Sequence, residues 1–305
     1  MIEVRGLTKR YGGKLAVDQL TFTVSPGRVT GFLGPNGAGK STTMRLILGL
    51  DAPSDGAVTV GGRRCRSVRR PLHQVGSLLE SAAIHPGRSA RSHLLALARA
   101  NGIGRRRVGE VLAITGLDGV AGRRAGGFSL GMTQRLGMAA ALLGDPPVLL
   151  LDEPVNGLDP DGVAWVRGLL RALAAEGRTV FLSSHLMSEM ENIADHLIVI
   201  GRGRLIADAP LAEFTRAAAA GHVQLRSPRQ DRLARLLQQA GATTTPGPGG
   251  SLLVTGASAA QVGDLAARHG IALHELLAQQ ASLEEAFMKL TRDAVEYRPH
   301  QQARA

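Results

Sequence analysis

The chain has a single cysteine, few aromatic residues and no long apolar run. Cys65 has no partner for an intramolecular disulfide, and no cysteine-based metal site is possible. Aromatic residues make up 3% of the sequence, so stacking platforms for nucleic-acid bases are not expected. No stretch reaches about 18 apolar residues, which excludes a membrane-spanning helix. The N-terminus lacks the charged-then-apolar pattern of a signal peptide, and we therefore expect a cytoplasmic protein.

Lysine is also scarce, and arginine carries nearly all of the positive charge. The formal net charge is +11, with lysine only at positions 9, 14, 40 and 289. Arginines gather at residues 63–70 and again at residues 105–107. Such a surface suits nucleic acid or an anionic membrane face, although a solvated face is the simpler interpretation. The charge alone does not select a partner.

The rest of the composition is that of a folded protein with a sizeable core, because 44% of the residues are hydrophobic and 20% are charged. Strands alternate with helices from residue 1 to about residue 215, which predicts an α/β fold with a mainly parallel sheet. Period-two alternation at residues 2–7 and 20–24 predicts an antiparallel edge beside that sheet. Residues 92–100 and 106–116 have helical patterns.

A smaller α/β unit is predicted after a run of alanines. We expect a first domain at residues 1–216, an accessory domain at 222–293 and a disordered tail at 294–305. The accessory domain alternates strand-like and helical segments; the strands are expected at 222–226, 251–255 and 271–276, and the helices at 231–241 and 259–269. It contains no metal, catalytic or nucleotide motif. Dimer contacts, regulation and stabilisation of the first domain remain open as its role.

Residues 34–42 carry the strongest functional signal in the chain. They fit a glycine, four free positions and then Gly-Lys-Ser, the pattern of a phosphate-binding loop. A strand-like apolar run precedes the loop and a helical pattern follows it, so that backbone N–H groups and a helix N-terminus face the phosphate. The predicted nucleotide-binding residues of this loop are Gly34, Pro35, Asn36, Gly37, Ala38, Gly39, Lys40, Ser41 and Thr42.

Individual residues of the loop have separate predicted roles. Lys40 supplies a positive charge for the β- and γ-phosphates of ATP, and the hydroxyl of Ser41 is placed to ligate Mg²⁺. The sequence therefore predicts ATP and Mg²⁺ as the ligands.

Two carboxylates follow the buried run at residues 148–151. Asp152 is predicted to hold Mg²⁺, and Glu153 to orient or deprotonate the attacking water. His185 ends the next predicted strand and is predicted to hydrogen-bond the γ-phosphate and sense its presence. Glu153 and His185 are the predicted catalytic residues.

The segment at residues 128–135 resembles the signature sequence of the ATP-binding cassette (ABC) ATPases, usually Leu-Ser-Gly-Gly-Gln. Together with the phosphate-binding loop, Asp152, Glu153 and His185 in that order, it indicates an ABC nucleotide-binding subunit. The resemblance covers residues 2 to about 215. It implies an ABC ATPase core with a mainly parallel sheet, an antiparallel edge and a helical subdomain, followed here by the small C-terminal α/β domain.

The resemblance also implies roles for further nucleotide-binding residues. Tyr11 matches the aromatic that stacks on adenine. Ser129 and Gly131 match the signature positions that contact the γ-phosphate of an ATP held by the opposite subunit. Asp159 belongs to the segment that matches the D-loop between subunits. His185 matches the switch histidine of the family.

This sequence departs from the family pattern at two places. Leu130 and Met132 stand where the signature usually has Gly and Gln. Because Ser129 and Gly131 remain, the site is expected to work, with weaker ATP-driven closure as an open alternative. The residue after the predicted strand at 75–79 is Glu80, where the family has the Gln of its Q-loop, and Glu80 is a predicted Mg²⁺ ligand. Gln74 is the rival candidate, but it precedes the strand. Glu80 and the residues after it resemble ABC exporters of the bacitracin-resistance type.

The resemblance implies an ATPase that pairs head to tail with a copy of itself or a related subunit. It would power a separate transmembrane permease, for efflux of a drug, an antibiotic or a lipid, from the inner face of the cell membrane. A soluble ABC ATPase acting on nucleic acid or ribosomes is the alternative, and an importer subunit is a third. No coiled coil interrupts residues 40–129 and a single cassette is present, so a direct nucleic-acid partner is not expected.

Overall fold

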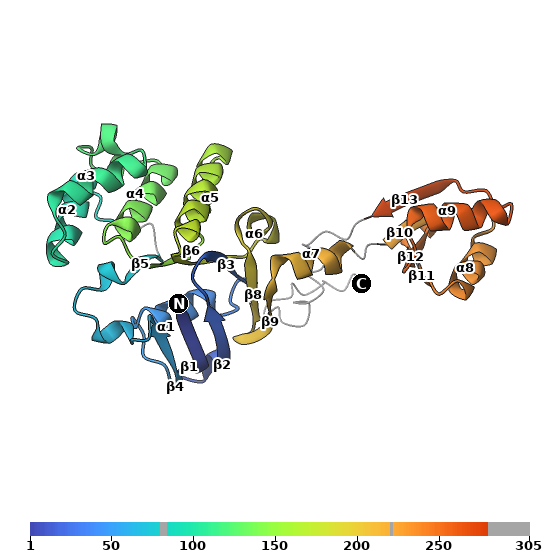
Figure 1. Ribbon diagram of the computed structural model, residues 1–305, viewed down its shortest axis with the longest axis horizontal. Coiled ribbons are helices and arrows are strands. Elements are labelled where there is room, and N and C mark those ends of the chain that lie inside the picture. Colours follow the sequence, from blue (N-terminus) through green and yellow to red (C-terminus); the bar gives the residue numbers. More distant parts are fainter. Residues whose placement is uncertain (80–83, 220–221, 280–305) are drawn as a thin grey trace, which may run out of the picture. The chain divides into compact units, whose positions relative to one another are not determined.

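A six-stranded sheet carries the predicted nucleotide-binding motifs in the computed structural model (Figure 1). Its strand order is β5-β6-β7-β3-β8-β9, and neighbours are parallel except for the antiparallel pair β8 and β9. The strands are β3 (Arg28–Leu33), β5 (Val75–Leu78), β6 (Val148–Asp152), β7 (Thr179–Ser184), β8 (His196–Gly201) and β9 (Arg204–Pro210). The loops after β3, β6 and β7 therefore emerge at one edge of the sheet, where α/β folds bind ligands. The predicted parallel sheet is confirmed.

The antiparallel strands form a sheet of their own rather than an edge of the parallel one. Its order is β2-β1-β4, with β1 at Ile2–Tyr11, β2 at Lys14–Val24 and β4 at Asp55–Val60. Alternation places one face of β1 and β2 in the core, where Phe22 packs against Phe32 and Phe181 of the parallel sheet at ring-centroid distances of 5.7 and 5.9 Å. The two sheets therefore share one apolar core.

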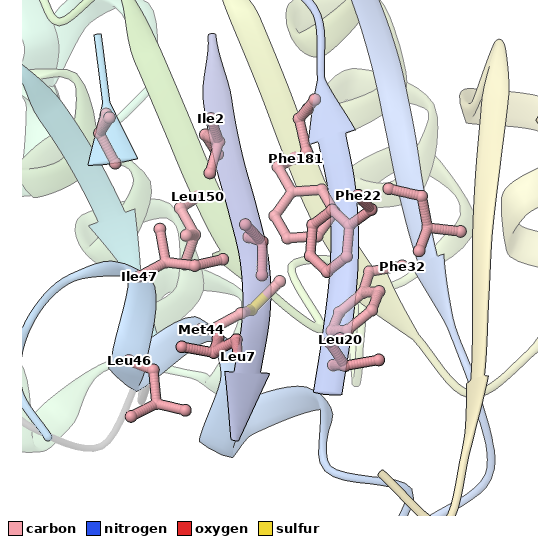
Figure 2. Close-up of a cluster of buried hydrophobic side chains, with 14 of the residues drawn as sticks. Ile2, Leu7, Leu20, Phe22, Phe32, Met44, Leu46, Ile47, Leu150 and Phe181 are labelled. Carbon is pink, nitrogen blue, oxygen red and sulfur yellow. The ribbon is translucent and has the colours of Figure 1, made fainter. Parts of the chain in front are cut away.

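Helix α1 (Lys40–Ile47) contributes to this shared core. Met44, Leu46 and Ile47 are buried, and Figure 2 shows them beside side chains of β1 and β6. Burial of this face holds the helix in place, and its first residue is Lys40 of the phosphate-binding loop. Packing of the core thus fixes the position of the loop.

Three helices lie between β5 and β6 in the sequence and form the predicted helical subdomain. They are α2 (Ala90–Ala100), α3 (Arg105–Ile114) and α4 (Leu130–Leu142), and each contacts the other two. Helix α4 also packs on β5, where a Cβ on Gly137 would lie 2.5 Å from Leu78. Helices α5 (Pro160–Ala175) and α6 (Met187–Ile193) precede and follow β7.

The chain divides into two units at Leu211 and Ala212. Helix α7 (Leu211–Ala219) begins at this division. The second unit contains β10 (His222–Arg226), α8 (Gln230–Gln239), β11 (Thr243–Pro246), β12 (Leu252–Thr255), α9 (Ala259–Arg268) and β13 (Glu275–Gln279). Its strands pair antiparallel in the order β11-β12-β10-β13, the split β-α-β arrangement.

Two strands of the second unit differ from the sequence expectation. Strand β11 was not predicted, because Thr243–Pro246 has no apolar alternation and gains its order from pairing with β12. Strand β13 begins at Glu275, whereas residues 271–276 were expected to form the strand. Ile271 is buried against the apolar cluster of this unit as part of the connection that follows α9.

The structure describes residues 1–79, 84–219 and 222–279. Glu80, the predicted tail and the last part of the accessory domain lie outside these ranges. Every helix within them is too short or too polar to cross a membrane.

Candidate functional site

A cavity of about 450 Å³ lies over the phosphate-binding loop. Residues 36–42 of the loop form part of its lining, and Glu153 contributes the carboxylate. The remaining lining comes from two β-hairpins: Tyr11, Lys14, Leu15, Ala16 and Arg202. The sequence identified the loop, Tyr11 and Glu153, and the structure brings them to one cavity.

The loop approaches its neighbours so closely that glycine is required. Gly39 has φ 104°, and a Cβ there would lie 2.6 Å from the carbonyl oxygen of Ala16. A Cβ on Gly34 would lie 2.5 Å from the carbonyl oxygen of Ile200. The loop is thus held between β2 and the end of β8, with its backbone turned into the cavity.

Lys40 is buried beneath the loop. Its Nζ donates to the carbonyl oxygens of Gly34 at 2.6 Å and Pro35 at 3.2 Å. Burial lowers the pKa of Lys40, while the charges of Glu153 and Asp152 act in the opposite direction. The side chain therefore lies at the cavity with its ammonium group already directed by hydrogen bonds.

The acidic residues meet His185 at the ends of two adjacent strands. Nδ1 of His185 lies 3.0 Å from Oε1 of Glu153, and Asn156 Nδ2 donates to Oε2 of the same carboxylate at 3.2 Å. The hydroxyl of Ser183 donates to Asp152 and accepts from the Glu153 backbone N–H at 3.0 Å. The two predicted catalytic side chains are therefore in contact, although 32 positions separate them in the sequence.

Glu153 has an unusual backbone conformation for a residue with a side chain. Its φ is 47°, in the left-handed region. The buried side chain of Gln134 supports this turn by donating from Nε2 to the carbonyl oxygens of Pro154 at 2.9 Å and Glu153 at 3.3 Å. Backbone strain of this kind persists only where neighbouring contacts impose it, and it is concentrated at functional sites.

Tyr11 lies at the mouth of the cavity and is 46% exposed. Its hydroxyl donates to Oδ2 of Asp51 at 2.8 Å, and Nζ of Lys9 lies 4.8 Å from its ring centroid. Partial desolvation and the Asp51 carboxylate raise the pKa of Tyr11. Because Arg45 also donates to Asp51, the pKa of that carboxyl falls to about 2. These contacts hold the half-exposed ring beside the cavity.

Ser129, Gly131 and Asp159 do not line this cavity. Ser129 is exposed and caps α4, its hydroxyl accepting from the Met132 N–H at 3.2 Å. Asp159 is exposed and caps α5, accepting from the Gly162 N–H at 2.9 Å. Leu130, 57% exposed, lies over the turn at Gly157, where a Cβ would be 2.2 Å from it. The signature residues therefore present an open surface.

The proposed metal ligands are only partly described. Ser41 lines the cavity, and Asp152 ends β6 and acts electrostatically on Lys40. Glu80 lies outside the described residues. Its rival Gln74 donates to the carbonyl oxygen of Val60 at 2.7 Å and does not line the cavity. No cluster of three or more His, Cys, Asp or Glu side chains suited to a metal occurs in the described part of the chain.

Sequence reasoning missed several residues of the site. Lys14, Ala16 and Arg202 line the cavity but belong to no motif that we recognised. Gln134 and Ser183 lie within recognised segments, yet only the fold reveals that they bind the backbone or side chains of the acidic turn. Arg202 lies in the turn of the β8–β9 hairpin, where Gly201 pairs with Arg204.

Comparison with known proteins places the first unit in a family. The family model described as ABC transporter matches residues 17–156, and a model described as a domain of unknown function matches residues 221–284. A bacitracin transport ATP-binding protein of Bacillus licheniformis is 43% identical over 213 residues, which are 69% of this chain and 70% of the relative. A lantibiotic transport ATP-binding protein of Streptococcus pyogenes is 35% identical, over 68% of this chain and 90% of the relative.

Solved structures give the same result. The ATP-binding subunit of an ABC transporter matches with a TM-score of 0.65 and 29% identity, over 71% of this chain and 92% of that chain. A dimeric bacterial ABC transporter cassette matches in fold with a TM-score of 0.64 and 23% identity, over 69% of this chain and 99% of that chain. Motifs, fold and relatives agree, and the chain belongs to the ABC transporter family as one of its ATP-hydrolysing, ATP-binding subunits.

Proposed function

We propose that this subunit hydrolyses ATP at a site shared with a second cassette and thereby powers a separate permease that exports an antibiotic or a lipid. The observation that carries the catalytic part is the contact of His185 with Glu153, whose side chain lines the cavity over the phosphate-binding loop. The export part rests on relatives named for bacitracin transport, lantibiotic transport and, in Rhizobium leguminosarum bv. viciae at 39% identity, Nod factor export.

Glu153 is the proposed general base for the attacking water. Its carboxylate lies at the cavity and is oriented by His185 and Asn156, which leaves it poised to accept a proton. His185 is the proposed sensor of the γ-phosphate, since it ends the strand next to that of Glu153. Loss of the γ-phosphate would change the hydrogen bonds of His185 and, through the 3.0 Å contact, those of Glu153.

Ser41 and Asp152 are the proposed residues that hold Mg²⁺, with Glu80 as a further proposed ligand. The oxygen donors of a hydroxyl and a carboxylate suit this hard cation, which usually binds through one or two carboxylates and substrate phosphates. When bound, Mg²⁺ supplies positive charge to the β- and γ-phosphate oxygens.

The proposed partner cassette would complete the ATP site with its Ser129 and Gly131. In one chain Ser129 is exposed and Gly131 is half-buried at the start of α4, and neither lines the chain's own cavity. A Ser hydroxyl and the N–H groups of a helix N-terminus bind phosphate oxygens well. The exposed Asp159 lies in the proposed contact between the two subunits. The partner is a second copy or a related subunit.

The proposed permease-docking surface is a hollow of about 420 Å³, to which Ile84, His93 and Leu97 contribute. Leu78, Leu79, Ile84 and Leu97 contribute apolar side chains to it, together with His93. Burial, with a contribution from Arg88, lowers the pKa of His93, so the imidazole is neutral at pH 7. A hollow of this character suits an apolar helix of a membrane protein, and such docking would hold the subunit at the inner face of the membrane.

A pull-down from detergent-solubilised membranes tests the proposal. Glu153→Gln with ATP and Mg²⁺ should retain the closed complex, and we expect a polytopic membrane protein without its own ATPase domain to co-purify. Glu191→Gln, an exposed glutamate outside the cavity, is the matched control. Capture of ribosomes or DNA instead of a membrane protein would overturn the export proposal and support the soluble alternative.

A further inference from the structure

A second hollow, away from the nucleotide cavity, is lined by basic side chains. Its volume is about 720 Å³, and Arg63, Arg69, Arg70 and His73 contribute its charged and titratable groups. These four residues come from the connection between β4 and β5, and Pro147 and Val148 at the start of β6 line it as well. Its arginines belong to the group at residues 63–70, one of the two arginine clusters of the sequence, and ATP hydrolysis does not explain this cluster.

The backbone that carries these arginines is held at both ends. Val60 and Arg63 exchange backbone hydrogen bonds of 2.8 and 3.1 Å, and Gln74 Nε2 donates to the Val60 carbonyl oxygen at 2.7 Å. Nε2 of His73 lies 3.1 Å from the carbonyl oxygen of Asn101. The connection that carries the arginines is therefore held by hydrogen bonds near both of its ends.

No carboxylate within the described residues forms an ion pair with Arg63, Arg69 or Arg70. Asp145, two residues before Pro147, is already paired with Arg107 at 3.2 Å and Arg178 at 2.8 Å. The lining itself contains no acidic residue. Three arginines thus line one concave surface without a counter-charge from the lining.

We propose that this hollow binds an anion that carries phosphate groups. The planar fork of a guanidinium matches phosphate oxygens in a bidentate manner, and several such groups in one concavity favour a multiply charged ligand. The lining has no Phe, Tyr or Trp on which a base could stack, which favours recognition of charge over recognition of a nucleobase. The phosphate groups belong either to a free anion or to the headgroups of an anionic lipid surface.

Calorimetric titration with tripolyphosphate tests the site, with ADP at saturation so that the phosphate-binding loop is occupied. We expect one further binding event, weakened at least about tenfold in Arg69→Gln/Arg70→Gln because charge-assisted contacts are lost. Arg123→Gln/Arg124→Gln removes the same charge from an exposed adjacent pair outside the hollow and should bind as the unaltered chain does. Thermal unfolding of both variants verifies that the fold is intact.

A second arm identifies the source of the phosphate. Vesicles of phosphatidylglycerol and phosphatidylcholine are compared in a flotation assay with the same variants. Tripolyphosphate binding without vesicle binding indicates a free anion, whereas vesicle binding that only Arg69→Gln/Arg70→Gln abolishes indicates lipid headgroups. If both double variants lose binding equally, the charge acts without a defined site and the proposal is overturned. It is also overturned if neither tripolyphosphate nor the vesicles bind.

Discussion

Lys40 shows how burial and charge oppose each other at a single side chain. Burial lowers its pKa, but the carboxylates of Glu153 and Asp152 counter this effect. The carbonyl oxygens of Gly34 and Pro35 accept from its ammonium group, which keeps a buried donor satisfied. A phosphate that enters the cavity would replace these acceptors by a stronger, charged one.

Asp51 supports Tyr11 through a charge that acid removes. Its folded-state pKa of about 2 lies below the ordinary 3.8, because Arg45 and Tyr11 donate to it. The carboxylate therefore stabilises the fold fully above about pH 4, and this contribution is lost as pH falls toward 2. Asp51→Asn should lower the free energy of unfolding at pH 7 by less than about 1 kcal/mol, since the pair is partly exposed to solvent.

Urea unfolding at several pH values checks this expectation. The difference between Asp51→Asn and the unaltered chain should shrink as pH falls from 5 toward 3. Asp118→Asn, which changes an exposed acid, should show no such trend. A difference that stays constant with pH would mean that the Asp51 charge does not stabilise the fold.

Residues with local motifs could be placed from the sequence, and residues that act through the fold could not. Asp152 and Glu153 follow a buried strand, so both were identified as acids of the site. Arg202 lies in the turn of one hairpin and Lys14 begins β2 of another, and both reach the cavity only because the hairpins pack beside the phosphate-binding loop. Such long-range convergence leaves no periodic pattern for sequence analysis to detect.

At the scale of elements, the turn between β8 and β9 supports the phosphate-binding loop. Gly203 has φ 78° and donates from its N–H to the Ala38 carbonyl oxygen at 2.9 Å. A Cβ there would lie 2.8 Å from the carbonyl oxygen of Ala16. Gly203→Ala should therefore displace the hairpin, reduce stability by about 1–3 kcal/mol and raise the KM for ATP.

Gly177→Ala is the matched control for this effect. Gly177 also has a positive φ, of 90°, but a Cβ would meet nothing within 4 Å. Gly177→Ala should lower the free energy of unfolding only by the conformational strain, about 1 kcal/mol, and should leave the KM for ATP unchanged. Equal KM values in the two variants would show that the hairpin does not support the loop.

Sequence analysis could not determine which sheet the first two strands join. Alternation in β1 and β2 indicated antiparallel strands with one buried face, and both strands exist. The apolar face of β2 packs against the parallel sheet through Phe22 instead of hydrogen-bonding to its edge. Either arrangement buries the same residues, so the pattern alone does not distinguish them.

At the scale of the whole molecule, the proposed ATP site needs two subunits. Ser129→Asp tests this, because Asp keeps the helix cap of α4 while it places a negative charge where a γ-phosphate from the partner would lie. We expect unchanged thermal stability and ATP binding to the single chain, but a fall in turnover of about 100-fold or more from charge repulsion.

Ser258→Asp is the control, since Ser258 caps α9 in the second unit in the same manner. It should alter neither stability nor turnover. Normal turnover in Ser129→Asp would show that the start of α4 does not contribute to hydrolysis, and the two-subunit site would have to be abandoned.

The most direct test of the catalytic claim is steady-state ATP turnover of Glu153→Gln beside Glu191→Gln. The amide keeps the size of the side chain but cannot take a proton from water, so turnover should fall about 100-fold or more while ATP binding is retained. Glu191→Gln should behave as the unaltered chain. Undiminished turnover in Glu153→Gln would contradict the proposed role of the contact between Glu153 and His185.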